Sequence, residues 1–290
     1  MTQSMHPNKK NTLAKVYLVG AGPGAADLIT LRGAKLLAQA EIVFHDALVE
    51  AEMLELCPQA IKVAVGKRCG KLSSAQQFIN KRLVDAAKQY KTIVRLKGGD
   101  PMLFGRADEE LSALKEIGIE VEVVPGITAA LAGAASLQQS LTLRGISRSV
   151  AFITQAQGTE NLVPGNPLAH PNADTLVYYM GRKDAAKIAQ QLIDTENKHS
   201  INTPVHILEA VSTQRERNWS STLGELAKGM AESWFDSNSP ALIMVGEALR
   251  ANSPEFEIDE KLAIDSDSFR SEVDDGLQNS QIFTNGRRRA

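Results

Sequence analysis

The chain has 290 residues, of which 43% are hydrophobic and 23% charged, a composition typical of a folded globular protein and a length sufficient for two domains or one large one. Its 32 basic and 34 acidic side chains leave a net charge of -2, which argues against bulk-charge binding to nucleic acid. The amino terminus up to Lys10 is polar, and no apolar run approaches the length of a membrane span. We therefore expect a cytoplasmic protein without a membrane partner.

The cysteines and histidines do not suggest a metal centre. Cys57 and Cys69 are the only cysteines, and their spacing matches no ligand pattern. The histidines are scattered singly, where surface or packing roles are commoner than ligation: His6, His45, His170, His199 and His206. We expect no bound metal.

The first half of the chain alternates short apolar runs with amphipathic segments. After a polar tail at 1–12, strands are predicted at 16–20, 42–45, 61–65, 92–96 and 120–124. Helices are predicted at 28–40, 50–56 and 106–117, and another runs from the turn at 125–128 to about residue 137. A further helix follows a capping box at 73–76, with Phe78, Leu83 and Val84 as its apolar stripe. This alternation implies a mostly parallel sheet with helices on both faces.

A second alternating set follows a weaker stretch around residues 138–148. Strands are predicted at 150–154, 175–179, 205–209 and 241–245, and helices at 184–194 and 223–232. The loop at 158–172 is too long to be a simple connection. The predicted fold is therefore α/β with two α/β domains, at 13–138 and 139–250, followed by a disordered tail at 251–290.

The stretch Arg95-Leu96-Lys97-Gly98-Gly99-Asp100-Pro101 ends a buried strand at two glycines, an acid and a proline. Adjacent glycines allow positive φ and close approach of a ligand, and Asp100 adds a carboxylate. In an open parallel sheet this edge is where ligands bind. The alternative is an ordinary turn in which Asp100 and Pro101 start the next helix.

The loop Gly20-Ala21-Gly22-Pro23-Gly24-Ala25 matches a loose dinucleotide fingerprint between a strand and a helix. Asp46 would then be the acid for the ribose. Against this interpretation, Pro23 lacks the N–H that a pyrophosphate needs, and Asp46 lies beyond the usual spacing of about 20 residues. A dinucleotide-dependent oxidoreductase therefore stays one alternative.

A series of motifs resembles the uroporphyrinogen-III C-methyltransferases of the tetrapyrrole methylase family over about residues 13–250. The motifs are Gly20-Ala-Gly-Pro-Gly with Leu28-Ile-Thr, Val65-Gly-Lys-Arg, Arg95-Leu-Lys-Gly-Gly-Asp-Pro, Phe104-Gly-Arg, Val124-Pro-Gly-Ile-Thr-Ala and Tyr179-Met-Gly. The resemblance implies two α/β domains with S-adenosylmethionine in the cleft between them, usually in a homodimer. It also implies two methylations of uroporphyrinogen III, giving precorrin-2, the precursor of siroheme, cobalamin and haem d1.

The resemblance also implies roles for individual residues. Those at the cofactor are Pro23, Gly98, Gly99, Asp100, Leu103, Thr128, Ala129, Met180 and Ala210. The catalytic residues are Asp46 as proton acceptor, Lys67 as proton donor, and Arg106. Substrate binding is assigned to Arg106, Glu109, Arg144 and Arg215.

Physical chemistry agrees with basic groups around such a substrate, because uroporphyrinogen III carries carboxylates that guanidinium groups bind well. The candidates next to the motifs are Arg106, Arg144, Arg148, Arg182 and Arg215, and a solvated surface role is the alternative for each. The chain departs from the family pattern at residues 47, 107–108, 143, 155–156 and 210–211. A methylase of a later corrinoid precursor and a non-catalytic protein that keeps the donor pocket are therefore further alternatives.

Overall fold

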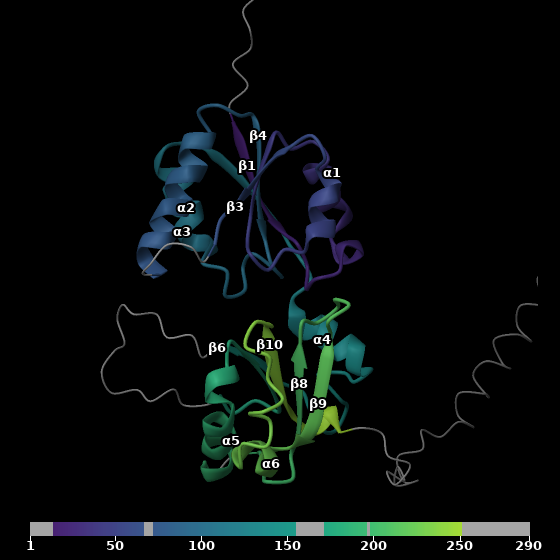
Figure 1. Cartoon of the computed structure of the whole chain (residues 1–290). Coiled ribbons are helices and arrows are strands. Elements are labelled where there is room, and N and C mark those ends of the chain that lie inside the picture. Colours follow the sequence, from purple (N-terminus) through teal and green to yellow (C-terminus); the bar gives the residue numbers. More distant parts are fainter. Residues whose placement is uncertain (1–13, 67–71, 155–170, 196–197, 251–290) are drawn as a thin grey trace, which may run out of the picture. The chain divides into compact units, whose positions relative to one another are not determined.

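The computed structural model describes residues 14–66, 72–154, 171–195 and 198–250 (Figure 1). The predicted terminal tails and residues 158–170 of the predicted long loop lie outside these ranges. Within them, no helix combines the length and apolar character that crossing a membrane requires.

A five-stranded sheet forms from the first half of the chain. Its strands are β1 (Lys15–Gly20), β2 (Ile42–His45), β3 (Ile61–Ala64), β4 (Thr92–Lys97) and β5 (Glu120–Val124). They lie in the order β3-β2-β4-β1-β5, and all neighbours are parallel, so the prediction of a parallel sheet is confirmed. The register pairs Gly20 with Lys97, which brings the loops after β1 and β4 level with each other.

Helices cover both faces of this sheet (Figure 1). They are α1 (Leu31–Leu37), α2 (Leu72–Ala86), α3 (Ala107–Glu116) and two short 3-10 helices, η1 (Ala26–Leu28) and η2 (Ala51–Leu56). Because side chains alternate along a strand, Leu18 of β1 packs in the core under α2 and α3, whereas the next residue, Val19, packs in the core under α1.

Two details of the helices predicted for the first half of the chain are wrong. The helix expected at 28–40 begins at Leu31, because the Thr30 hydroxyl accepts a hydrogen bond from Gly33 N–H and caps the helix there. In α2, Leu83 is fully buried, but Phe78 is 47% exposed and contacts Arg82 by a cation–π interaction. The predicted apolar stripe is therefore narrower than the sequence indicated.

The second sheet is mixed. Its strands are β6 (Val150–Thr154), β7 (Thr175–Tyr179), β8 (Pro204–Glu209), β9 (Arg217–Thr222) and β10 (Ala241–Gly246), in the order β6-β7-β10-β8-β9. β6 and β7 are parallel, whereas β10 is antiparallel to β7 and β8, and β8 to β9. The sequence did not predict β9, an edge strand of mostly exposed polar residues.

Three further α-helices pack on this second sheet. α5 (Ala185–Asp194) and α6 (Leu223–Ala227) cover one face, and α4 (Ala129–Leu137) lies against the other, where Ala130 packs with Val177 and Leu208. Short 3-10 helices are η3 (Arg182–Asp184) and η4 (Glu247–Leu249). The helix predicted at 223–232 ends early, at Ala227. The domain division at residue 138 stays a prediction, with α4 packed on the sheet that follows it.

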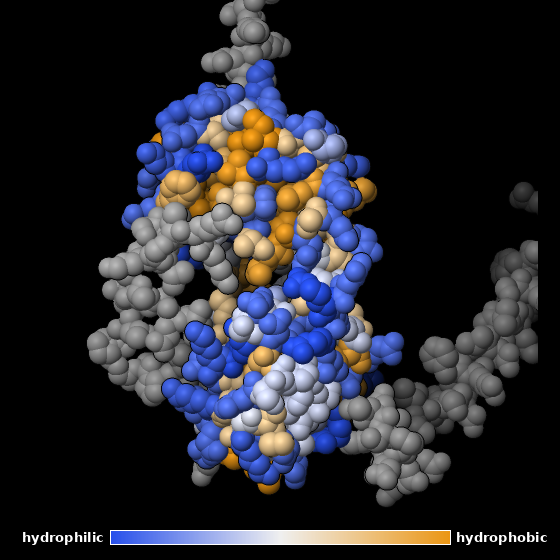
Figure 2. All heavy atoms as spheres, viewed as in Figure 1, coloured by the Kyte–Doolittle hydropathy of each residue, from blue (hydrophilic) through white to orange (hydrophobic). Residues whose placement is uncertain are grey.

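Apolar residues also reach the surface near the first sheet (Figure 2). Large apolar side chains exposed in the first half of the chain include Leu48, Ile61 and Phe78. On the viewed face, polar residues surround the apolar area. The buried cores therefore do not contain all of the large apolar side chains of this part of the chain.

Candidate active site

The loops that follow β1, β4 and β5 meet at the carboxyl edge of the first sheet. Gly99 N–H donates to Gly22 O at 2.7 Å, and Gly22 N–H donates to Gly99 O at 3.2 Å. A Cβ on Gly20 would lie 2.6 Å from Gly126 Cα, and one on Gly126 would lie 2.3 Å from Gly99 O. Glycine is therefore required where these loops cross. We call Gly20, Gly22, Gly99 and Gly126 the glycine platform.

Asp100 fastens this platform. Its Oδ2 accepts from Gly126 N–H and its Oδ1 from Met102 N–H, both at 2.8 Å. The carboxylate thus holds the loop after β4 against the loop after β5. The alternative that Asp100 and Pro101 start the next helix is wrong, because α3 begins at Ala107.

Gly99 is the open position of the platform. Its φ is +67°, and no described atom lies within 4 Å of where a Cβ would stand. The backbone here is therefore accessible to a ligand at a point where a side chain would both strain the chain and occupy the space.

The dinucleotide interpretation of the first glycine loop is not favoured. Ala21 N–H donates to Lys97 O at 2.7 Å, and Gly22 N–H is bonded to Gly99 O. Pyrophosphate binding uses free N–H groups at a helix N-terminus, but α1 starts only at Leu31. Hydrogen bonds within the protein thus occupy the groups that the fingerprint would offer.

Residues after β5, β7 and β8 complete this surface. Ala25 N–H donates to Ser212 Oγ at 3.1 Å, and Ser212 lies two residues after the predicted cofactor residue Ala210. Tyr179 OH bonds Thr128 Oγ1 at 2.6 Å and accepts from Ala130 N–H at 3.2 Å. Met180 follows Tyr179 directly.

These contacts bring together the loops that carry the predicted cofactor residues. Pro23 lies between Gly22 and Gly24, and a Cβ on Gly24 would meet Thr213 Cγ2 at 2.5 Å. Leu103 lies in the loop after β4, where the neighbouring Phe104 ring is 5.2 Å from that of Tyr179.

Backbone strain gathers in the same loops. Residues other than glycine with positive φ include Phe104 (52°), Arg106 (53°), Met180 (57°), Ala210 (48°) and Ser212 (62°). Such a conformation costs an L-residue about 1–2 kcal/mol. Strain of this kind is characteristic of functional sites, which supports the placement of the site here.

Asp46, at the end of β2, contacts a buried charge cluster. Its Oδ1 accepts from Arg95 Nη2 at 2.5 Å, and its side chain is 30% exposed whereas that of Arg95 is 2% exposed. Arg95 Nε donates to Glu110 Oε1 at 3.1 Å, and Lys97 Nζ donates to the same oxygen at 3.2 Å. Burial, followed by the neighbouring Arg95 charge, lowers the pKa of Lys97.

No local pattern in the sequence marks these charged residues as one cluster. The available signal was that Arg95 and Lys97 are charged residues within the buried strand β4. Buried charges need partners, and Glu110 on α3 is such a partner.

The predicted substrate residues are less closely gathered. Arg106 forms a two-bond ion pair with Glu109, from Nε to Oε1 at 2.6 Å and from Nη2 to Oε2 at 2.8 Å. Arg215 Nη2 donates to Glu50 Oε1 at 2.7 Å. Arg144 is exposed in a turn closed by hydrogen bonds between Leu143 and Ser147.

Two of the other arginine candidates make hydrogen bonds within the second half of the chain. Arg182 Nη1 donates to Ser239 O at 3.1 Å and to Asp236 O. The backbone N–H of Arg148 donates to Asp174 Oδ2 at 3.0 Å. Arg182 therefore has a structural role in this fold. Lys67, the predicted proton donor, lies outside the described residues.

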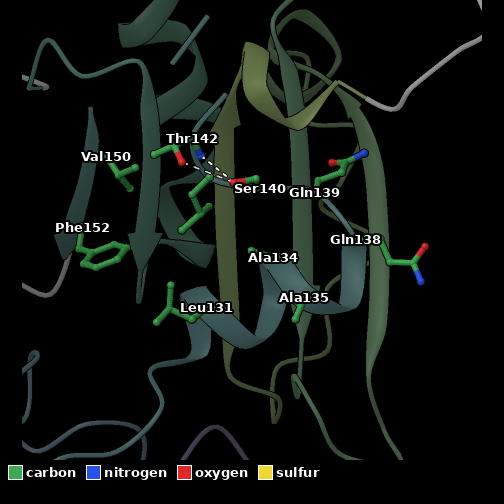
Figure 3. A pocket seen from close by; sticks show the side chains of 10 residues that line it. Leu131, Ala134, Ala135, Gln138, Gln139, Ser140, Thr142, Val150 and Phe152 are labelled. Atoms are coloured by element: carbon green, nitrogen blue, oxygen red, sulfur yellow. Dashed lines mark hydrogen bonds between the residues drawn. The ribbon is translucent and has the colours of Figure 1, made fainter. Parts of the chain in front are cut away.

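A groove of about 530 Å³ lies elsewhere, along α4 and β6 (Figure 3). Leu131 and Phe152 line it, with small and amide side chains from the end of α4. None of the predicted catalytic, cofactor or substrate residues belongs to this lining. Its apolar character suits packing rather than proton transfer.

Comparisons with known proteins relate most of the chain to others. The family model described as Tetrapyrrole (Corrin/Porphyrin) Methylases matches residues 15–227. The chain is 42% identical to a uroporphyrinogen-III C-methyltransferase of Pseudomonas aeruginosa, over 81% of this chain and 94% of that protein. It is 43% identical to a siroheme synthase of Pseudomonas fluorescens, over 81% of this chain and 50% of that protein. The chain thus spans about half the length of the siroheme synthases it matches.

A solved structure gives the corresponding fold. It is a uroporphyrin-III C-methyl transferase from Thermus thermophilus complexed with S-adenyl homocysteine, 37% identical, with a TM-score of 0.69. The match covers 82% of this chain and 99% of that one. The predicted α/β fold is confirmed by this likeness.

Proposed function

This chain belongs to the tetrapyrrole methylase family, and we propose that it transfers two methyl groups from S-adenosylmethionine to uroporphyrinogen III, giving precorrin-2. The open space at Gly99, on a platform fastened by Asp100, is the observation that carries the proposal. Support also comes from the 42% identity to a uroporphyrinogen-III C-methyltransferase over nearly all of that protein.

The donor supplies an electrophilic methyl group on a sulfonium. Gly98 and Gly99 would allow the backbone to approach it closely, so that carbonyl oxygens face its polarised C–H groups. The remaining cofactor residues that we propose are Pro23, Asp100, Leu103, Thr128, Ala129, Met180 and Ala210. Asp100 would also hold the loops of the glycine platform, since each of its oxygens accepts a backbone hydrogen bond.

Methyl transfer requires a carbon nucleophile held in line with the methyl group, followed by loss of a proton. We assign proton acceptance to Asp46, whose carboxylate is partly exposed at the sheet edge that carries the glycine platform. Lys67 stays the predicted proton donor.

The carboxylates of the macrocycle would be bound by Arg106, Arg144 and Arg215. Glu109 would orient the Arg106 guanidinium through their two-bond ion pair. Arg215 would exchange its exposed partner Glu50 for a substrate carboxylate, since an exposed ion pair is weak.

We propose in addition that the protein is a cytoplasmic homodimer divided into domains near residue 138. Light scattering of the purified protein would measure its oligomeric state. Limited proteolysis would locate the domain division.

Mass spectrometry of uroporphyrinogen III incubated with the protein and S-adenosylmethionine tests the reaction directly. Two added methyl groups are expected. Binding of S-adenosylhomocysteine without methylation would contradict the proposed substrate while leaving the donor site in place. Methylation of a later corrinoid precursor instead would reassign the substrate within the family.

A further inference from the structure

The charge cluster around Arg95 extends from the interior of the first sheet to its carboxyl edge. Glu110 is fully buried, and its Oε1 accepts hydrogen bonds from Arg95, Lys97 and Gln76. Arg95 and Lys97 are both almost fully buried. The opposite end of the cluster is Asp46, which is partly exposed.

Charge balance makes Asp46 part of this cluster. Arg95 and Lys97 are two cations, whereas Glu110 is the single fully buried carboxylate among the described members. Unpaired buried charge is strongly unfavourable, so a second carboxylate is needed nearby. Asp46 supplies it through Arg95 Nη2.

Arg95 has little freedom to move. Its Nε is bonded to Glu110, and its Nη1 donates to Leu96 O at 3.0 Å and to Phe44 O at 3.5 Å. The planar guanidinium is therefore fixed from two sides, which leaves Nη2 aimed at Asp46.

Asp46 is in turn held at two points. Its backbone N–H donates to Leu96 O at 3.2 Å, and its Oδ1 is bonded to Arg95. No described residue hydrogen-bonds the other oxygen, Oδ2. One carboxylate oxygen is thus anchored and the other is available.

We propose that Arg95, anchored by Glu110, is a positioning residue that fixes Oδ1 of Asp46 so that Oδ2 accepts the proton released after methyl transfer. This inference rests on the proposed function. In that step the bond between the methylated ring system and the departing hydrogen breaks. Its electron pair stays in the ring and cancels the positive charge brought by the methyl group, and the proton forms an O–H bond on Oδ2.

A double-mutant cycle tests this role. Arg95→Lys keeps the positive charge but loses the planar guanidinium with its several N–H donors, so Asp46 is held less precisely. We expect kcat to fall roughly tenfold to a hundredfold, which is the scale of a small misplacement of a reacting group. The KM for S-adenosylmethionine and the affinity for S-adenosylhomocysteine should change less than about twofold. In an Asp46→Asn background, Arg95→Lys should have almost no further effect on kcat, because residues that act as a unit are non-additive.

An ion pair outside the proposed site, with a fully buried carboxylate but a half-exposed arginine, provides the control. Arg217 pairs with Glu209, which is also fully buried, between β8 and β9. Arg217→Lys should lower the melting temperature while its effect on kcat, if any, stays the same with and without Asp46. If Arg95→Lys does not fold, the same cycle is run with Glu110→Gln, which keeps the side-chain shape.

Two outcomes distinguish a failure of this inference from a failure of the proposed function. If the wild-type protein methylates uroporphyrinogen III but the kcat effects of Arg95→Lys and Asp46→Asn multiply independently, Arg95 does not act through Asp46 and the inference is overturned. A wild-type protein that transfers no methyl group overturns the proposed function, and the inference with it.

Discussion

Gly99 and Gly118 share one backbone conformation, with φ of +67° and +73°, and neither has a described atom within 4 Å of an ideal Cβ. They differ in place, since Gly99 belongs to the glycine platform and Gly118 follows α3. We expect Gly99→Val to abolish S-adenosylhomocysteine binding in calorimetry, because the side chain fills the open space. Gly118→Val imposes a similar strain of about 1–2 kcal/mol and should leave binding intact. If both variants lose S-adenosylhomocysteine affinity equally, backbone strain alone explains the effect, and Gly99 is not at the binding site.

Arg144 and Arg182 provide a second contrast between single residues. Arg144 is exposed, whereas Arg182 donates to the backbone carbonyls of Asp236 and Ser239. Arg144→Ala should weaken uroporphyrinogen III binding by about 1.5–3 kcal/mol, the range for a hydrogen bond to a charged group. Arg182→Ala should instead lower the melting temperature. Titration of the macrocycle and thermal denaturation measure the two effects, and unchanged macrocycle affinity in Arg144→Ala would remove it from the substrate site.

At the scale of elements, α4 ends at a residue poorly suited to its conformation. Gln138 follows the helix with φ +55°, where glycine is the usual residue. Gln138→Gly should raise the free energy of unfolding by roughly 0.5–1 kcal/mol in urea denaturation. Lys115→Gly, in the last turn of α3, should lower it, by at most about 1 kcal/mol. A destabilised Gln138→Gly would mean that the side chain makes a compensating contact.

The sequence predicted elements well where apolar runs are bounded by glycine, proline or polar residues. β2, β5, β6 and β7 have the predicted bounds. It did not predict β9, because Arg217–Thr222 is stabilised by pairing with β8 and carries one large apolar residue, Trp219. Pairing with a distant strand leaves no periodic signal in the edge strand itself.

The candidate site could be predicted in part for a related reason. Gly99 and Asp100 could be predicted because they directly follow an apolar strand. The other cofactor residues were predicted from the family motifs. The bonds from Thr128 to Tyr179 and from Arg95 to Asp46 join residues far apart in the sequence. No local sequence pattern predicts such pairs, so the charge cluster could be recognised only in the folded structure.

For the whole molecule, two buried histidines predict how stability depends on pH. His206 bonds Ser220 Oγ at 2.7 Å and Leu249 O at 2.8 Å, and His199 bonds Ala173 O at 3.2 Å. Burial lowers the pKa of both below the usual value of 6.5. Below that pH the unfolded chain binds more protons than the folded one, so the free energy of unfolding should fall as pH falls.

Urea denaturation at about pH 7.5 and about pH 5.5 measures this dependence. Each histidine contributes at most about 1.4 kcal/mol per pH unit. In His206→Gln, the difference in the free energy of unfolding between the two pH values should be smaller by the contribution of His206. The variant should also be less stable than the wild type at both pH values. The same pH dependence in His206→Gln and in the wild type would contradict the assignment.

The charge cluster also has a consequence for how the first sheet assembles. Arg95 and Lys97 lie two residues apart in β4 and reach the same face, toward Glu110, whereas Leu96 packs on the opposite face. A slip of β4 by one residue against β1 and β2 would turn both cations into the apolar layer under α1 and carry Leu96 to Glu110. That arrangement buries two unpaired charges, so misaligned pairings of β4 are less stable than the native register. Arg95 and Lys97 thus specify the register of the central strand.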